Sequence, residues 1–178
     1  MKVVIAGVGN RLMGDDGCGS YLAEALEGSV INADVIDMGA TGISAIEILK
    51  DYDVIIIIDA AIIDKPVEVI HFTPQLNEDT ATSTTLDLIF SGSHGLGIET
   101  ILTFLRIYGY NPSRIIIIGC KAYYMDYNLG LSKELLHNMP NIVEIIERLL
   151  KEYNIILDKQ KFISRLYEIL GVNNDRSY

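Results

Sequence analysis

Two runs of four consecutive isoleucines restrict the possible fold more than any other feature of this sequence. One run, Ile55–Ile58, ends at Asp59, and the other, Ile115–Ile118, ends at Gly119. A strand that is apolar at every position must be covered on both faces, as it is in a parallel sheet between two layers of helices. The two runs therefore predict buried strands of an α/β domain, and Ile55–Ile58 in particular should lie at its centre.

Shorter patterns place further strands and helices around these two runs. Strands are predicted at Val3–Ala6, Val30–Asp37 and Val67–Phe72, and helices after residue 19, at Ile43–Leu49, at Ile98–Tyr108, beyond Pro140 and over 158–170. The alternation of strands and helices predicts a three-layer α/β domain with a mainly parallel sheet. With 178 residues, 49% of them hydrophobic, the chain can bury one full core. We expect residues 1–153 to form this domain and residues 154–178 to add a C-terminal helical extension and tail to it.

Composition excludes several classes of partner. The formal net charge of −10 disfavours binding to nucleic acid or to an anionic membrane, and favours a cation or a basic peptide. The two cysteines, Cys18 and Cys120, form no CxxC motif, so neither a disulfide framework nor a cysteine metal site is predicted. The first apolar run is too short for a signal peptide, and no run approaches 18 apolar residues. We therefore expect no membrane insertion and a location in the reducing cytoplasm.

The glycine-rich loop after the first strand has two interpretations. Gly7 and Gly9, together with Asp37 at the end of the second strand, are similar to a dinucleotide-binding fingerprint. However, Asp15 and Asp16 place two negative charges where a pyrophosphate would bind. Two such charges ~5 Å apart repel by roughly 3 kcal/mol at an effective dielectric of ~20. Adjacent carboxylates are better suited to a cation or to a water that is to be activated.

Several acidic residues follow the predicted parallel strands and should meet at one edge of the sheet. Asp15 and Asp16 follow the first strand, Asp37 ends the second, Asp59 ends the third, and His94 lies in a glycine-bounded loop before a helix. Carboxylates and an imidazole suit nickel, zinc or a similar divalent ion, so we expect Asp16, Asp59 and His94 to surround an exposed cleft.

Each of these residues also has a structural interpretation. Asp15 is suited to be a helix N-cap, and Asp16 to be an acid in the first helical turn. Asp59 can cap the strand end, Asp37 can bond backbone amides in its turn, and His94 can be an ordinary loop histidine.

A set of motifs connects these residues to a known family. In chain order they are Gly7–Gly19 (GVGNRLMGDDGCG), Asp37–Thr41 (DMGAT), Ile58–Ala60 (IDA), Ser93–Gly97 (SHGLG), Ile118–Gly119 and Gly130–Ser132. Over residues 1 to about 150 they closely resemble the [NiFe]-hydrogenase maturation endopeptidases. The opening motif is specific because it combines GxGN with an acidic pair.

The resemblance implies an α/β/α sandwich with a five-stranded, mostly parallel mixed sheet. It also implies a peptidase that removes a C-terminal extension from the hydrogenase large-subunit precursor after nickel insertion. Asp16, Asp59 and His94 match the metal-binding positions of the family, and Asp37 matches a further acidic position, so Asp16 and Asp37 are the catalytic candidates. Some members have Glu where this chain has the shorter Asp16. Nickel would arrive with the precursor, although zinc or another divalent ion could occupy the site in vitro.

Two other classes of function remain at this point. A dinucleotide-binding oxidoreductase would have to bind NAD despite Asp15 and Asp16. A non-catalytic nickel-binding maturation chaperone would keep the metal site but would leave the length of the precursor unchanged.

Overall fold

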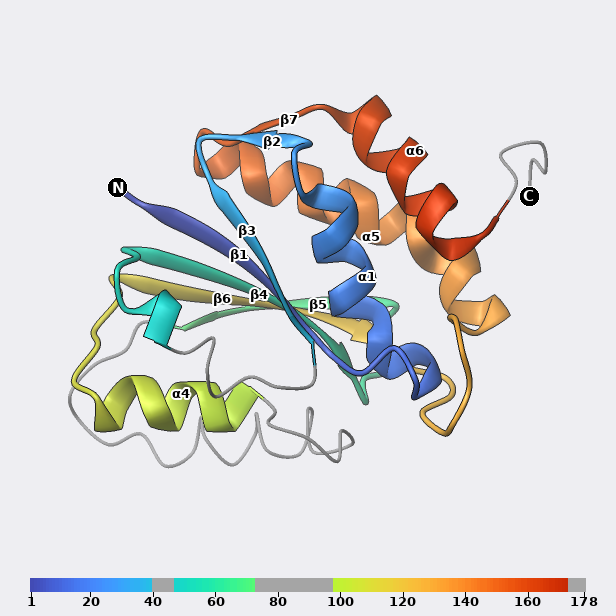
Figure 1. The fold of residues 1–178 in the computed structure, drawn as a ribbon, viewed down its shortest axis with the longest axis horizontal. Coiled ribbons are helices and arrows are strands. Elements are labelled where there is room, and N and C mark those ends of the chain that lie inside the picture. The colour runs from blue at the N-terminus through green and yellow to red at the C-terminus, as the bar shows by residue number, and fades with distance from the viewer. Residues whose placement is uncertain (40–46, 73–97, 173–178) are drawn as a thin grey trace.

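A five-stranded sheet runs through the middle of the molecule, as Figure 1 shows for the computed structural model, which describes residues 1–39, 47–72 and 98–172. The strands lie in the order β3 (Asp34–Gly39), β1 (Val3–Val8), β4 (Val54–Ala61), β6 (Arg114–Lys121) and β5 (Val67–Phe72). The first four are parallel to their neighbours, and β5 is antiparallel to β6. The predicted five-stranded, mostly parallel mixed sheet is thus confirmed.

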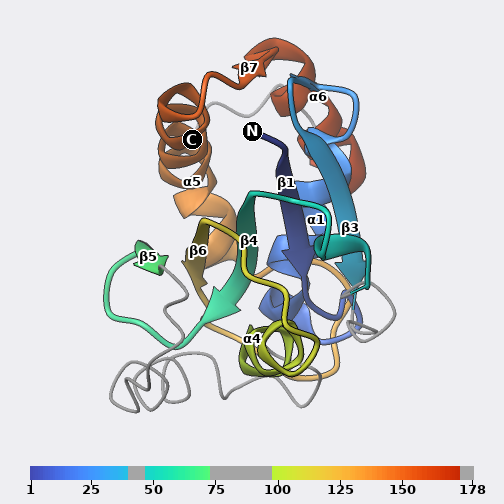
Figure 2. The ribbon, with the colours of Figure 1, turned by 90° about the vertical axis from the view of Figure 1, so that its left-hand side faces the viewer.

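Helices cover both faces of this sheet, and the isoleucine runs supply both halves of the core. Helices α1 (Cys18–Leu26), α5 (Lys133–Glu152) and α6 (Lys159–Leu170) lie on one side, and α4 (Ile98–Ile107) lies on the other (Figures 1 and 2). Ile56 and Ile116 pack into the layer with α1 and α5, whereas Ile55 and Ile115 pack into the layer with α4. Alternate side chains of one strand thus bury themselves in opposite layers, which explains why neither run tolerates a polar residue.

The path of the chain creates a topological switch point at the carboxyl ends of two central strands. After β1 the chain passes through α1 to β3 on one side of β1, and it then returns to β4 on the other side. Ligand sites of open α/β sheets lie at such a switch point, beyond the carboxyl ends of the strands. In this chain the switch point lies between the loop after β1 and the end of β4.

The segment predicted as one strand over Val30–Asp37 is two strands. The short strand β2 (Val30–Ile31) leaves the main sheet and pairs antiparallel with β7 (Ile156–Leu157), and β3 begins at Asp34. Between them, Asn32 has a φ of 73°, a left-handed conformation that breaks an extended strand. The prediction of a continuous strand was therefore wrong.

The long C-terminal helix begins earlier than its apolar pattern predicted. Helix α5 starts at Lys133 and contains Pro140, because the Ser132 hydroxyl accepts a hydrogen bond of 3.1 Å from the Leu135 N–H and caps the helix. Helix α4 ends at Ile107, just before Gly109, whose φ is 69°. Only residues 47–49 of the predicted Ile43–Leu49 helix are described, and they are helical.

The C-terminal segment after residue 153 packs against the beginning of the chain. Helix α6 follows the predicted range closely and buries Phe162 and Leu166. The Arg165 guanidinium donates to the Glu24 carbonyl of α1 at 3.0 Å, and the Lys161 ammonium donates to the Gly28 carbonyl at 2.7 Å.

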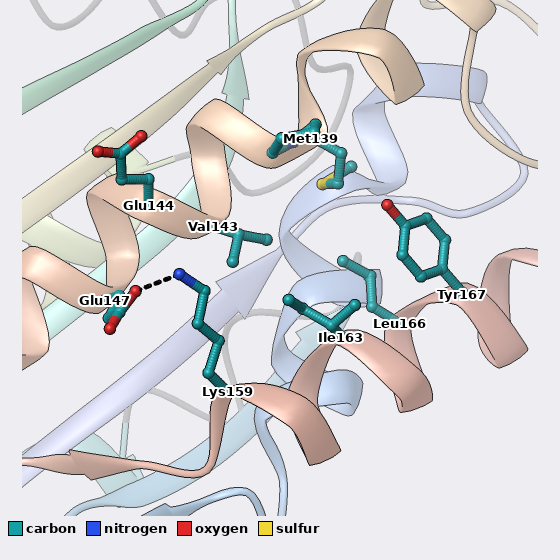
Figure 3. A pocket seen from close by; sticks show the side chains of 9 residues that line it. Met139, Val143, Glu144, Glu147, Lys159, Ile163, Leu166 and Tyr167 are labelled. Atoms are coloured by element: carbon teal, nitrogen blue, oxygen red, sulfur yellow. Dashed lines mark hydrogen bonds and ion pairs between the residues drawn. The ribbon is translucent and has the colours of Figure 1, made fainter. Parts of the chain in front are cut away.

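A groove of about 310 Å³ separates α6 from α5 (Figure 3). Met139, Val143 and Leu166 supply apolar lining, and Lys159 bonds Glu147 across the groove. None of the described helices is long and apolar enough to cross a membrane.

Candidate functional site

Glycines in and after the first loop allow three pieces of backbone to approach one another closely. Gly9 has a φ of 133°, and a Cβ placed on it would lie 1.7 Å from the Asp16 carbonyl oxygen. A Cβ on Gly19, at the start of α1, would lie 2.1 Å from the Ile58 carbonyl oxygen of β4. The glycine pattern that is similar to a dinucleotide fingerprint is therefore accounted for by packing of the loop, α1 and β4.

Asp15 ties this loop to the loop that follows β6. Its carboxylate is fully buried and accepts hydrogen bonds from the Tyr123 and Tyr124 N–H groups at 2.8 and 3.0 Å. It also accepts from the Ser132 N–H at 2.7 Å and from the Ser132 hydroxyl at 2.8 Å. Gly17 occupies the N-cap position of α1 and makes no side-chain cap. The N-cap interpretation of Asp15 was wrong, and its role is to join two distant loops.

Asp16 and Asp59 form a pair of buried carboxylates at the switch point of the sheet. Asp16, in the short 3-10 helix η1 (Gly14–Gly17), is 6% exposed, and its Oδ2 accepts from the Asn10 N–H at 2.9 Å. Asp59, near the end of β4, is 1% exposed, and its Oδ1 accepts from the Ala60 N–H at 2.8 Å. Within the described ranges, Asp59 Oδ2 finds no hydrogen-bond donor. Both side chains are buried because one bonds loop backbone and the other lies in a central strand that is paired on both sides. The exposed cleft around Asp16, Asp59 and His94 stays a prediction, since His94 lies outside the described residues.

The charge state of Asp59 follows from this environment. Burial raises the pKa of the Asp59 carboxyl well above its usual range, and the nearby negative charge of Asp16 raises it further. The hydrogen bond from the Ala60 N–H lowers the pKa but does not offset the other two effects. A proton or a cation between Asp16 and Asp59 would relieve this repulsion.

Asp37 lies at the end of β3 in a network of hydrogen bonds. Its Oδ2 accepts from the Arg11 guanidinium and from the Ser20 hydroxyl, both at 2.9 Å, and its Oδ1 accepts from the Gly39 N–H at 3.0 Å. The structure therefore gives Asp37 the backbone hydrogen bond expected of a turn residue and, in addition, an ion pair.

Arg11 is the partner that sequence reasoning did not single out. Besides Asp37, its guanidinium donates to the Ser20 hydroxyl at 2.7 Å, forms an ion pair with Glu24, and lies 4.6 Å from the centre of the Tyr21 ring. Ser20, Tyr21 and Glu24 all lie on α1. Arg11 thus fastens the loop that carries Asp16 to α1 and to β3.

Two cysteines lie next to the paired carboxylates. Cys18 and Cys120 are buried and free. A hydrogen bond with Cys120, burial, and the charges of Asp15 and Asp59 all raise the pKa of the Cys18 thiol well above its ordinary value. Since the thiolate is the nucleophilic form, this environment disfavours Cys18 as an attacking group.

The predicted metal ligands are only partly described. His94 lies outside the described residues, together with the loop that surrounds it. Across residues 1–39, 47–72 and 98–172, no group of three or more His, Cys, Asp or Glu side chains could hold a metal ion. Two carboxylates, those of Asp16 and Asp59, come together at the switch point, and they are oxygen donors that suit a divalent cation.

Comparison with known proteins decides the family. A family model for hydrogenase maturation proteases matches residues 18–149. The chain belongs to this family. It is also 27% identical over 155 residues to the hydrogenase 2 maturation protease of Escherichia coli, a match that covers 85% of this chain and 88% of that one.

Solved structures agree with this assignment. The hydrogenase maturating endopeptidase HybD from E. coli shares the fold, with a TM-score of 0.70 and 22% identity over 90% of this chain and 99% of that one. The [NiFe] hydrogenase maturation protease HybD from Thermococcus kodakarensis is 26% identical, with a TM-score of 0.56, over 84% of this chain and 99% of that one. The chain is therefore a hydrogenase maturation peptidase, and the dinucleotide-binding interpretation receives no support.

Proposed function

We propose that this peptidase removes the C-terminal extension of a [NiFe]-hydrogenase large-subunit precursor in the cytoplasm after nickel has been inserted. Membership of the hydrogenase maturation protease family supports the reaction, and the similarity to a [NiFe] hydrogenase maturation protease supports the class of client. The observation that carries the proposal is the pairing of Asp16 with Asp59 at the switch point of the sheet, which provides an acidic site for a metal-bearing substrate.

In this proposal, Asp16, Asp59 and His94 engage the nickel ion that the precursor already carries. Nickel belongs to the substrate, and zinc or another divalent ion would occupy the same ligands in vitro. The two carboxylates fit this role because each is negative when ionised and Asp59 Oδ2 has no hydrogen-bond donor in the described part of the chain. A bound cation would favour the ionised form of Asp59 and so offset the effect of burial on its pKa.

The peptide bond is then broken by water. Asp16 is our candidate to accept the proton of the attacking water, because it lies near Asp59 at the switch point and its loop is fixed by Arg11 through Ser20. Asp37 remains the second catalytic candidate, and its hydrogen bonds with Arg11 and Ser20 support a role in holding the loop in position. The buried Cys18 takes no part as a nucleophile.

The test is cleavage of the precursor in the presence and absence of nickel. We expect the nickel-loaded large subunit to shift to its mature size on a gel, and the nickel-free precursor to remain uncut. A preference of ~3 kcal/mol for the loaded form corresponds to a discrimination of roughly 150-fold. Asp16→Ala should abolish cleavage, whereas the control Asp51→Ala, an exposed carboxylate before the start of β4, should cleave normally.

Two results would contradict the proposal in different ways. Equal cleavage of nickel-free and nickel-loaded precursor would overturn recognition through nickel. Binding of the nickel-loaded precursor without any change in its length would instead support the non-catalytic chaperone.

A further inference from the structure

Large apolar side chains gather on two loops beside the site. Leu12 lies in the loop after β1, and Tyr123, Tyr124, Tyr127 and Leu129 lie in the loop after β6; their exposed fractions run from 41 to 75%. These five residues, which we call the aromatic loop patch, are among twelve large hydrophobic side chains that are exposed in the described ranges. Such a concentration on two loops is typical of a surface that binds another molecule.

The backbone beneath this patch is held firmly. The Gly14 N–H donates to the Asn128 carbonyl at 2.9 Å, and the Asn128 N–H donates to the Leu12 carbonyl at 3.0 Å. The Asp15 N–H donates to the Tyr124 carbonyl at 2.9 Å, while the Asp15 carboxylate binds the same loop in return. A surface fixed in this way loses little conformational entropy when it binds a partner.

The patch adjoins the loop that carries Asp16. Leu12 and Asp16 belong to one loop, and Met13 of that loop forms a bridge with Asn128 of the other. In Figures 1 and 2, the segment that precedes α1 lies beside the segment that precedes α5. A chain that presents a peptide bond to Asp16 would therefore pass close to the patch.

The chemistry of the patch selects an apolar peptide segment. Beside the tyrosines is an open hollow of about 600 Å³, which Asn128, Ser132, Lys133 and Glu134 also line. The one positive and one negative charge in this lining balance each other, so charge contributes little to selection. Tyrosines supply contact area with few rotatable bonds and a hydroxyl for hydrogen bonding, a combination that is enriched where proteins bind polypeptides.

We propose that the aromatic loop patch docks apolar residues of the polypeptide substrate next to the bond that is cleaved. The inference rests on the proposed function, in that the polypeptide is taken to be the hydrogenase large-subunit precursor. Docking at the patch acts on substrate affinity, because none of the five side chains supplies a group to the reaction.

The experiment measures binding and cleavage with the nickel-loaded large-subunit precursor of the same organism. The test variant is Tyr127→Ser with Leu129→Ser, and Leu12→Ser is a second variant on the other loop. The control is Ile31→Ser with Ile156→Ser. These two isoleucines are 61 and 57% exposed and pair between β2 and β7, far from the patch in Figure 1. Equilibrium binding is measured in an Asp16→Asn background, and KM and kcat are measured in chains that retain Asp16.

Both loop variants should bind the precursor at least about tenfold more weakly, with KM raised to match and kcat within about twofold of the parent. The control should bind and cleave like the parent. Unchanged affinity in both loop variants would overturn the inference. It would also be overturned if the loop variants converted a dimer into a monomer without changing precursor affinity, since the patch would then bind a second copy of this chain.

The two proposals fail separately. If the precursor binds through the patch but is never cut by the parent, then the docking inference stands and the proposed reaction fails. If the precursor is cut with unchanged KM by both loop variants, then the reaction stands and docking fails.

Discussion

Two buried carboxylates near Asp16, those of Asp15 and Asp59, differ in how many hydrogen bonds they accept. Asp15 is fully buried and accepts four hydrogen bonds from one distant loop. Asp59 is nearly as buried and, among the described residues, accepts one, from the N–H of its own neighbour Ala60. Asp15 therefore replaces its lost hydration with protein donors, whereas Asp59 does so only in part.

The contrast separates a structural acid from a functional one. A carboxylate with a full set of donors stabilises the fold and has no lone pair left for a ligand. A carboxylate that is buried with few donors destabilises the fold in its ionised form, and it persists where a proton or a cation is to be bound. Judged by their burial alone, Asp15 and Asp59 would not have been distinguished as a structural and a functional acid.

The largest effect expected from this contrast is the loss of stability when Asp15 is replaced. Asp15→Ala removes the acceptor of three part-buried backbone N–H groups and should lower the free energy of unfolding by about 3 kcal/mol. For a domain of this size that corresponds to a fall of about 10 °C in Tm. Ser132→Ala, which removes one of the four bonds and also the N-cap of α5, should cost about 2 kcal/mol in the same thermal scan. Equal Tm values for Asp15→Ala and the parent would remove the distinction between the two acids.

Asp59→Asn should act in the opposite direction on stability. The amide keeps an acceptor for the Ala60 N–H but cannot ionise. We therefore expect Tm at pH 7.5 to rise by about 3 °C, which corresponds to an increase of about 1 kcal/mol in the free energy of unfolding. The pKa of Asp59 is higher in the folded state than in the unfolded chain. As pH rises through the ordinary carboxyl range, the unfolded chain therefore loses the Asp59 proton before the folded protein does. The parent thus loses stability relative to the variant as pH rises. The rise in Tm caused by Asp59→Asn should therefore be smaller at pH 4.5 than at pH 7.5. Precursor cleavage should be lost. A variant that is less stable at pH 7.5 would show that Asp59 is a structural residue.

Arg11 tests whether the position of Asp16 depends on the contacts of its loop. Arg11→Lys keeps the charge, but a lysine cannot reach Ser20, Glu24 and Asp37 together. Because the group is part-exposed, the free energy of unfolding should fall by only about 1 kcal/mol, which corresponds to a fall of about 3 °C in Tm. We expect the fall in kcat to be larger than the rise in KM, since the loop that carries Asp16 and Leu12 moves while the four docking residues of the loop after β6 stay in place. Lys50→Met, which removes the exposed ion pair with Glu47, is the matched control and should change neither quantity. A rise in KM alone would show that Arg11 contributes to substrate binding.

The smallest effect is expected at Glu147, between α5 and α6. Hydrogen bonds from Lys151 and then Lys159 lower the pKa of Glu147 to about 2. A lowered pKa stabilises the fold at pH values above the ordinary pKa of 4.5, and this stabilisation is lost as pH falls toward 2. Glu147→Gln should therefore lower Tm slightly at pH 6, and the difference from the parent should shrink by pH 3. A difference that is constant over this range would mean that packing, and not charge, is responsible.

Sequence reasoning recovered what local patterns determine. The isoleucine runs identified the central strands because a strand that is buried on both faces is apolar at every position, and such a run is recognised directly in the sequence. The split of the predicted strand Val30–Asp37 was missed because it depends on the pairing of β2 with β7, from near the other end of the described chain.

The candidate site shows the same limit. The acids at the carboxyl ends of strands could be placed near one another from topology alone. The role of Asp15 could not, because its partners lie 108 to 117 residues further along the chain. Part of the Arg11 cluster was accessible, since Ser20 and Glu24 are one turn apart on the following helix, on the face that a preceding basic residue can reach.

The contact between α1 and α6 affects how the protein folds as it is synthesised. Arg165 and Glu24, which join the two helices, are 141 residues apart. While the ribosome makes the residues between them, the face of α1 that later packs against Phe162 and Leu166 has no partner. The nascent domain therefore remains incompletely covered until α6 emerges. A chain interrupted after α5 would present an open apolar surface to chaperones and proteases, so quality control would reach incomplete copies before they reached a precursor.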